Sequence, residues 1–158
     1  MRRIAVSGHR GLPVDTSDLV EAAMRAALAD DAANVTGLSC LADGADQIFA
    51  RVILDLGGQI EAVVPSDGYR DGLPRQAHAA YDRLIEQATV VHRLSYAEST
   101  SEAHMAASEF MIGMACELWA VWDGLPARGY GGTADVVAYS RTRATPVKVI
   151  WPAGARRD

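Results

Sequence analysis

Residues 35–56, VTGLSCLADGADQIFARVILDL, contain one complete strand–turn–helix unit and decide the fold class. Residues 35–41 form a short, mostly apolar run, as expected of a parallel strand that is covered on both faces. Asp43 then precedes a helical pattern whose apolar side chains share one face: Ile48, Phe49, Val52, Ile53 and Leu56. Gly57-Gly58 is expected to end this helix.

The same unit recurs along the chain about every 25 to 30 residues, the period of strand–helix repeats. Apolar runs predict six strands, at residues 4–6, 35–41, 60–64, 89–94, 118–122 and 147–151. Helical patterns lie between them: after the possible N-caps at 15–18, after Asp43, and at 75–88, 102–115 (with Ser99 and Glu102 at capping-box spacing) and 133–143. This alternation predicts an α/β fold, a doubly wound, mostly parallel, six-stranded Rossmann-like sheet with helices on both faces. No linker divides the chain, so residues 1–158 are expected to form a single domain.

Composition and missing motifs exclude several classes of protein. The chain is 49% hydrophobic and 22% charged, as in globular domains, and no apolar run approaches the roughly 20 residues that cross a bilayer. We therefore expect a cytoplasmic protein without a membrane partner. The net charge of −5 argues against nucleic acid as a partner. Two cysteines and four scattered histidines show no metal-ligand spacing, and the dinucleotide and Walker-type fingerprints are absent, so no metal and no cofactor are expected.

In a doubly wound sheet, ligands bind beyond the carboxyl ends of the strands, where loops enter helices. The first predicted strand ends in Ser7-Gly8-His9-Arg10-Gly11. Glycine lets backbone amides approach an anion, and the Arg10 guanidinium can make a two-pronged contact with it. A tight turn with a surface arginine explains these residues equally well, and His9 is also typical of a turn. Gly8, His9 and Arg10 are thus ligand-binding candidates with a structural alternative.

The second turn, Leu41-Ala42-Asp43-Gly44-Ala45-Asp46, places small residues at a helix start, where exposed amides suit a phosphate. Either Asp43 or Asp46 is expected to cap the helix. The other carboxylate is then free for a ribose hydroxyl, in preference to a metal ion. Asp43, Gly44 and Asp46 are the candidates of this turn.

The third turn gives the strongest local signal for a ligand. Gly129-Tyr130-Gly131-Gly132-Thr133 has three glycines within four residues directly before an amphipathic helix. Such a turn forms a nest of amides, and the threonine hydroxyl can donate to an anionic oxygen. The predicted phosphate-binding residues here are Arg128, Gly129, Gly131, Gly132 and Thr133. Asp135, in the first turn of the helix, has the alternative role of complementing the helix dipole.

Together, Ser7-Gly8-His9-Arg10, the Gly44-Ala45-Asp46 helix start and the Tyr130-Gly131-Gly132-Thr133 helix start resemble motifs of the SLOG superfamily. That group includes Lonely-Guy-type phosphoribohydrolases, Smf/DprA-type DNA-processing proteins and many small Rossmann-like proteins. The resemblance covers nearly the whole chain. It implies a nucleotide or nucleotide-derived ligand, with its phosphate at Gly131-Gly132-Thr133, and a homo-oligomer.

The sequence departs from the enzymatic branch of that family, whose motif is P-G-G-x-G-T-x-x-E with an arginine on the preceding helix. Aligned on Thr133, Tyr130 replaces a glycine and Val136 replaces the glutamate, and the 102–115 segment has no arginine. The incomplete set favours a binding or sensing module for a small nucleotide-like molecule. An N-glycosidase of nucleoside monophosphates remains the alternative, with the catalytic acids Asp135, Glu109 and Asp123.

Two further alternatives concern partners and loops. A DNA-processing scaffold fits the predicted fold but not the net charge. The loop 69–72 is either a lid over the base of the ligand or a structural segment, with Tyr69 as a core anchor and Arg70 as a solvated charge.

Overall fold

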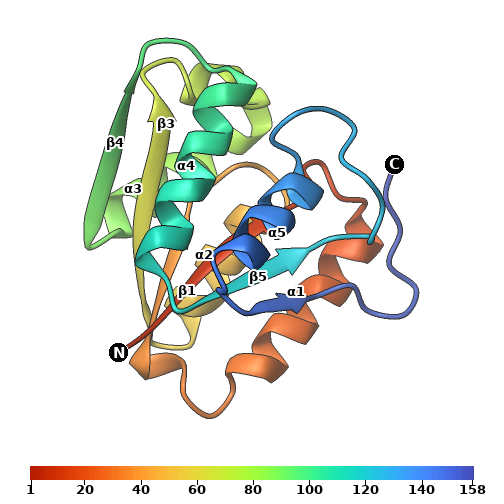
Figure 1. The fold of residues 1–158 in the computed structure, drawn as a ribbon. Coiled ribbons are helices and arrows are strands. Elements are labelled where there is room, and N and C mark those ends of the chain that lie inside the picture. The colour runs from red at the N-terminus through yellow and green to blue at the C-terminus, as the bar shows by residue number, and fades with distance from the viewer.

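The computed structural model describes residues 1–158 and contains one six-stranded sheet, in the order β4-β3-β2-β1-β5-β6 (Figure 1). Every pairing between neighbouring strands is parallel. The strands are β1 (Arg2–Gly8), β2 (Val35–Ser39), β3 (Gln59–Ser66), β4 (Val90–Tyr96), β5 (Glu117–Val121) and β6 (Val147–Val149). The helices are α1 (Val14–Leu28), α2 (Ala45–Asp55), α3 (His78–Gln87), α4 (Ser101–Met114) and α5 (Thr133–Thr142).

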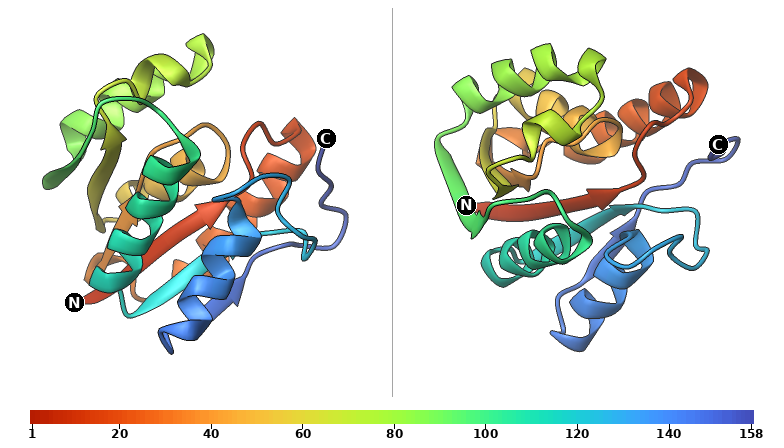
Figure 2. Two further views of the ribbon diagram at one scale, coloured as in Figure 1. Left: turned by 45° about the horizontal axis from the view of Figure 1, so that its top comes forward. Right: turned by 90° about the horizontal axis from the view of Figure 1, so that it is seen from above.

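Helices cover both faces of the sheet, so the molecule has three layers (Figure 2). α1, α2 and α3 lie on one face, and α4 and α5 lie on the other. The apolar runs of the sequence form the central strands, and β2 is buried along its whole length. The largest fully buried side chains include Trp119, Phe49, Ile4 and Met24. The prediction of a doubly wound α/β fold with helices on both faces is confirmed. No helix is long and apolar enough to span a membrane.

The chain reverses its direction of travel across the sheet between β1 and β5. From β1 it moves outward through β2 and β3 to the edge strand β4, and α4 then carries it back to β5 on the other side of β1. The loops after β1 and β5 therefore leave the sheet toward opposite faces. In an open α/β sheet, such a switch point creates a crevice at the carboxyl ends of the strands.

Several predicted boundaries and caps were wrong. α1 begins at Val14 with Pro13 at the N-cap, so the run 15–18 lies inside the helix instead of capping it. Thr100, and not Ser99, caps α4, because its side chain accepts a hydrogen bond from the Ala103 amide. β2 ends at Ser39 and not at residue 41, because the Ser39 hydroxyl accepts the Leu41 amide and draws the chain into a turn.

Candidate ligand-binding site

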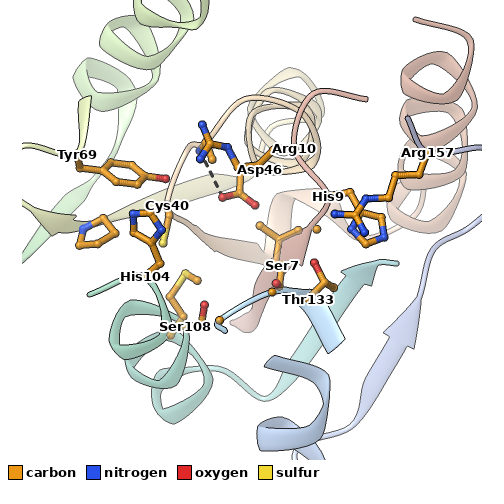
Figure 3. A pocket seen from close by; sticks show the side chains of 17 residues that line it. Ser7, His9, Arg10, Cys40, Asp46, Tyr69, His104, Ser108, Thr133 and Arg157 are labelled. Atoms are coloured by element: carbon orange, nitrogen blue, oxygen red, sulfur yellow. Dashed lines mark hydrogen bonds between the residues drawn. The ribbon is translucent and has the colours of Figure 1, made fainter. Parts of the chain in front are cut away.

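A cavity of about 240 Å³ opens at the switch point between β1 and β5 (Figure 3). Its walls come from six parts of the chain. They are the end of β1, the turn into α2, the end of β3 with the following turn, α4, the start of α5 and the segment after β6: Val6, Ser7, Gly8, His9, Arg10, Cys40, Ala42, Asp46, Pro65, Tyr69, His104, Ser108, Met111, Gly131, Gly132, Thr133 and Arg157. The structure thus brings residues from all three predicted turns to one cavity.

Gly8 ends β1 where the sheet and α2 come closest together. A methyl group at this position would lie 2.4 Å from the Cβ of Ala45 and 2.8 Å from the Cβ of Val121. The missing side chain therefore lets α2 and β5 pack directly against the end of β1. Close packing alone accounts for a glycine here.

His9 is buried, with 4% of its surface exposed, and connects β1 to the loop after β5. Its Nε2 accepts a hydrogen bond from the Asp123 amide at 3.0 Å, and Trp151 packs against the ring edge-on. Burial lowers the pKa of His9, and the nearby Arg157 guanidinium lowers it further. A neutral imidazole that holds two loops together matches the turn role considered from the sequence.

Asp43 ties the first turn to the second. Its carboxylate accepts hydrogen bonds from Arg10 Nε at 2.9 Å and from the Gly11 amide at 3.1 Å. Arg10 remains half-exposed at the cavity rim, whereas Asp43 and Gly44 border a shallower neighbouring hollow. Asp43 is thus engaged by the protein's own arginine, and Gly44 supports the turn with a φ of 86°.

Asp46 is the one carboxylate that lines the cavity. One of its oxygens accepts a hydrogen bond from the Ala42 amide at 3.3 Å, and no positive group pairs with it directly. Burial raises the pKa of Asp46 to about 7, although the Ala42 amide and the charge of Arg10 oppose the shift. The prediction that Asp43 or Asp46 caps α2 was wrong, because the N-cap is Gly44 and no side chain caps the helix.

The glycine turn before α5 is partly satisfied from within. The Gly131 amide donates to Asp135 Oδ2 at 2.9 Å, and the Gly132 amide donates to the Gly129 carbonyl at 3.3 Å. Gly131 has a φ of 85°, which favours glycine for a conformational reason. The expected nest is therefore smaller than the sequence suggested, and at the start of α5 the amides of Thr133 and Ala134 have no protein acceptor. Arg128 and Gly129 are exposed outside the cavity.

The opposite wall is uncharged. Tyr69 is buried and packs edge-on against His104, whose Nε2 lies 2.8 Å from Ser99 Oγ. Burial raises the pKa of the Tyr69 phenol and of the Cys40 thiol, and it lowers the pKa of His104. All three groups are therefore neutral near pH 7. Arg70, next to Tyr69, instead forms a two-pronged ion pair with Asp82 on the surface. The loop 69–72 thus has Tyr69 as a core anchor and Arg70 as a solvated charge.

Five polar side chains that line the cavity make no hydrogen bond within the protein: Ser7, Tyr69, Ser108, Thr133 and Arg157. Figure 3 shows Tyr69 reaching into the cavity from the side opposite to Ser7 and Thr133. Their polar atoms are open to the cavity, where a ligand can reach them. This cavity therefore offers unused donors and acceptors on several sides at once.

The three carboxylates that the sequence offered as catalytic acids lie elsewhere. Asp123 faces His9 and accepts the Leu125 amide, and Asp135 accepts the Gly131 amide. Glu109 lies on the other side of α4, in a shallow groove beside β4. The structure does not bring any of them into the lining of the cavity.

The sequence analysis did not propose Ser7, Cys40, Ser108 or Arg157 as site residues. It treated Tyr69 only as part of the loop 69–72. A signal existed for α4, because His104, Ser108 and Met111 follow helical spacing and share one face. Arg157 had no such signal, because it follows the last strand and belongs to no motif.

No family model matches the chain, and no curated protein is significantly similar to it in sequence. Solved structures do share its fold. DprA from Streptococcus pneumoniae superposes with a TM-score of 0.68 at 18% identity, over 94% of this chain and 50% of that one. DprA from Helicobacter pylori, described for its single-stranded DNA binding mode, gives 0.65 at 15% identity, over 94% and 64%. The chain thus spans half to two-thirds of these proteins.

A molybdenum cofactor binding protein from the phototrophic bacterium Rippkaea orientalis superposes with a TM-score of 0.62 at 13% identity, over 94% of this chain and 75% of that one. From the net charge we expected that nucleic acid is not a partner of this protein. The likeness to the DprA structures does not support that expectation. At these identities the likeness concerns the fold alone. The chain shares the Rossmann-like fold of these structures, as the sequence predicted.

Proposed function

We propose that the protein binds a small phosphate-bearing molecule of the nucleoside monophosphate type in the cavity at the switch point. The observation that carries this proposal is the group of five cavity-lining polar side chains that make no hydrogen bond within the protein: Ser7, Tyr69, Ser108, Thr133 and Arg157. A ligand with a phosphate and several hydroxyl groups would supply the missing hydrogen bonds.

The polarity of the walls suggests how such a ligand lies. The free amides of Thr133 and Ala134 stand at the positive end of the α5 dipole, which favours a phosphate there. The neutral wall around Tyr69 and His104 suits a base. Asp46 lies between the two ends (Figure 3), where its carboxylate can accept from a ribose hydroxyl. A neighbour of this fold that is named as a cofactor-binding protein supports a small-molecule ligand.

Isothermal titration against AMP, CMP, GMP and UMP tests the proposal, with the matching nucleosides as phosphate-free comparators. We expect saturable binding of at least one monophosphate and much weaker binding of its nucleoside. The panel also includes cyclic nucleotides and nucleoside diphosphates. If the protein binds none of these nucleotides at millimolar concentration, the proposal is contradicted. Single-stranded DNA is titrated in parallel at two salt concentrations, because salt-sensitive binding would instead favour the DNA-processing alternative.

A nucleotide N-glycosidase is a second candidate, and one observation favours it. Asp46 lies in the cavity, and its pKa of about 7 suits a general acid or base near neutral pH. Asp46 therefore replaces Asp135, Glu109 and Asp123 as the group to test. Release of free base from the bound monophosphate, lost in Asp46→Asn and retained in Asp135→Asn, is the expected result. If the wild-type protein releases no more free base than the Asp46→Asn protein, the activity is ruled out.

A further inference from the structure

Arg157 reaches the cavity from a part of the chain that none of the three glycine-bearing turns includes. Its side chain is 22% exposed, and Figure 3 shows it beside His9. The nearest carboxylate oxygen, on Asp123, lies 3.9 Å away, and no hydrogen bond is made to any protein group. A guanidinium has five N–H donors in a planar fork. This enclosed cation therefore has most of its donors unused at the edge of the cavity.

The residue before Arg157 is fixed to α1 by an exchange of hydrogen bonds. Thr16, which is fully buried, donates its hydroxyl hydrogen to the Arg156 carbonyl at 2.9 Å and accepts from the Arg156 amide at 2.9 Å. The Arg156 guanidinium also pairs with Asp15 at 3.3 Å. Further back in the same segment, Trp151 packs against His9. We call this contact between Arg156 and Thr16 the clasp.

The clasp determines where Arg157 can lie. Because the Arg156 backbone is held on both its amide and its carbonyl, the direction of the chain into Arg157 is set. The Arg156 side chain points to the outside of α1, and the Arg157 side chain turns the other way, toward His9 and the end of β1. A long side chain that is held in place at its backbone loses less conformational freedom when it binds a ligand.

We propose that Arg157 is a phosphate-binding residue of the cavity and that the clasp positions it. Arg157, held in this way, selects a terminal phosphate monoester over a diester. This inference rests on the proposed function and adds to it a cation that no motif contains. A monoester carries close to two negative charges near neutral pH and exposes three oxygens, whereas a diester carries one charge. A guanidinium fork that lines the same cavity as the α5 N-terminus matches the former.

The probe is the monophosphate among AMP, CMP, GMP and UMP that binds the wild-type protein most tightly, with its 3′,5′-cyclic form as the diester. Arg157→Ala should weaken monophosphate binding about 10- to 100-fold, the range for a charge-assisted hydrogen bond, and should affect the cyclic form much less. Arg157→Lys should restore part of the loss. Arg143→Ala is the matched control, because it removes the same charge from an exposed site at the far end of α5.

Thr16→Val tests the clasp, because valine keeps the shape of threonine and removes both hydrogen bonds. It should weaken binding less than Arg157→Ala, and the double variant should bind no more weakly than Arg157→Ala alone. Circular dichroism and thermal melting confirm that each variant is folded.

The outcomes separate the two proposals. A wild-type protein that binds no monophosphate contradicts the proposed function and this inference with it. If the wild-type protein binds the monophosphate and Arg157→Ala does not weaken that binding, the inference is overturned and the proposed function stands. The same holds if Arg143→Ala weakens binding as much as Arg157→Ala does. Additive losses from Thr16→Val and Arg157→Ala overturn the positioning role of the clasp.

Discussion

Asp46→Asn should make the protein more stable above neutral pH and leave its stability nearly unchanged below about pH 4. Asp46 lies at the cavity wall, partly shielded from solvent, where burial disfavours its charged form and raises its pKa to about 7 from 3.8. Its one hydrogen bond, from the Ala42 amide, can be kept by the asparagine carbonyl. The substitution therefore removes a charge and retains the local contact.

The size and the sign follow from proton linkage. Between about pH 4 and pH 7 the folded protein holds the Asp46 proton more tightly than the unfolded chain, so stability falls as pH rises through this window. A shift of roughly three units at about 1.4 kcal/mol each gives a loss of about 4 kcal/mol by pH 8. Asparagine has no such loss. The gain corresponds to a difference in melting temperature on the order of 10 °C for a chain of this size.

Urea unfolding of the wild-type protein and of Asp46→Asn, at pH 3.5 and at pH 8, measures this difference. The two stabilities should agree at the lower pH and diverge at the higher one. Asp18→Asn is the control, because this aspartate is exposed on α1 and has no partner, so its profile should follow the wild type. Parallel profiles for wild type and Asp46→Asn would show that the protein does not penalise the charge on Asp46.

Three further substitutions test the turns around the cavity. Gly8→Ala should destabilise the fold by about 1–3 kcal/mol in urea unfolding, because its methyl group would overlap Ala45 and Val121; wild-type stability would refute that packing. Asp135→Ala should lower the free energy of unfolding by about 1 kcal/mol, because it removes the acceptor of the Gly131 amide. Asp135→Asn should lower it clearly less, and equal losses from the two variants would show that this hydrogen bond does not stabilise the turn. Thr133→Val should melt like the wild type but bind the best monophosphate of the panel about tenfold more weakly by titration, and unchanged affinity would place the phosphate away from this hydroxyl.

The architecture was predictable because its determinants are local. A parallel strand that is buried on both faces needs an apolar run, and a covering helix needs an apolar stripe, so the unit at 35–56 reveals both. The positions of the three ligand-side turns followed, because turns at the carboxyl ends of parallel strands lie along one edge. The caps were less predictable, since α1 and α2 form without a side-chain cap.

The composition of the cavity was not predictable from single motifs. Asp135 is four residues after Gly131, and only the turn geometry shows that its carboxylate occupies that amide. Arg157 is far in sequence from Gly8 and enters the site because the segment after β6 crosses back to α1. Tyr69 and Ser108 face the cavity because β3 and α4 meet above the end of β1. Such placements depend on topology and side-chain packing, which a sequence pattern does not specify.

The recognisable turn residues and the unpartnered residues have separate roles in this site. Gly8, Asp43 and Asp135 each satisfy a need of the protein itself: close packing, a tie between two turns and a hydrogen bond to an amide. Tyr69, Ser108 and Arg157 have unused hydrogen-bonding groups and come from outside the glycine turns. Proteins that share these turns can therefore share a cavity and differ in what fills it. We accordingly expect the ligand of this protein to be decided by the walls and by the segment after β6, which a likeness in fold alone does not reveal.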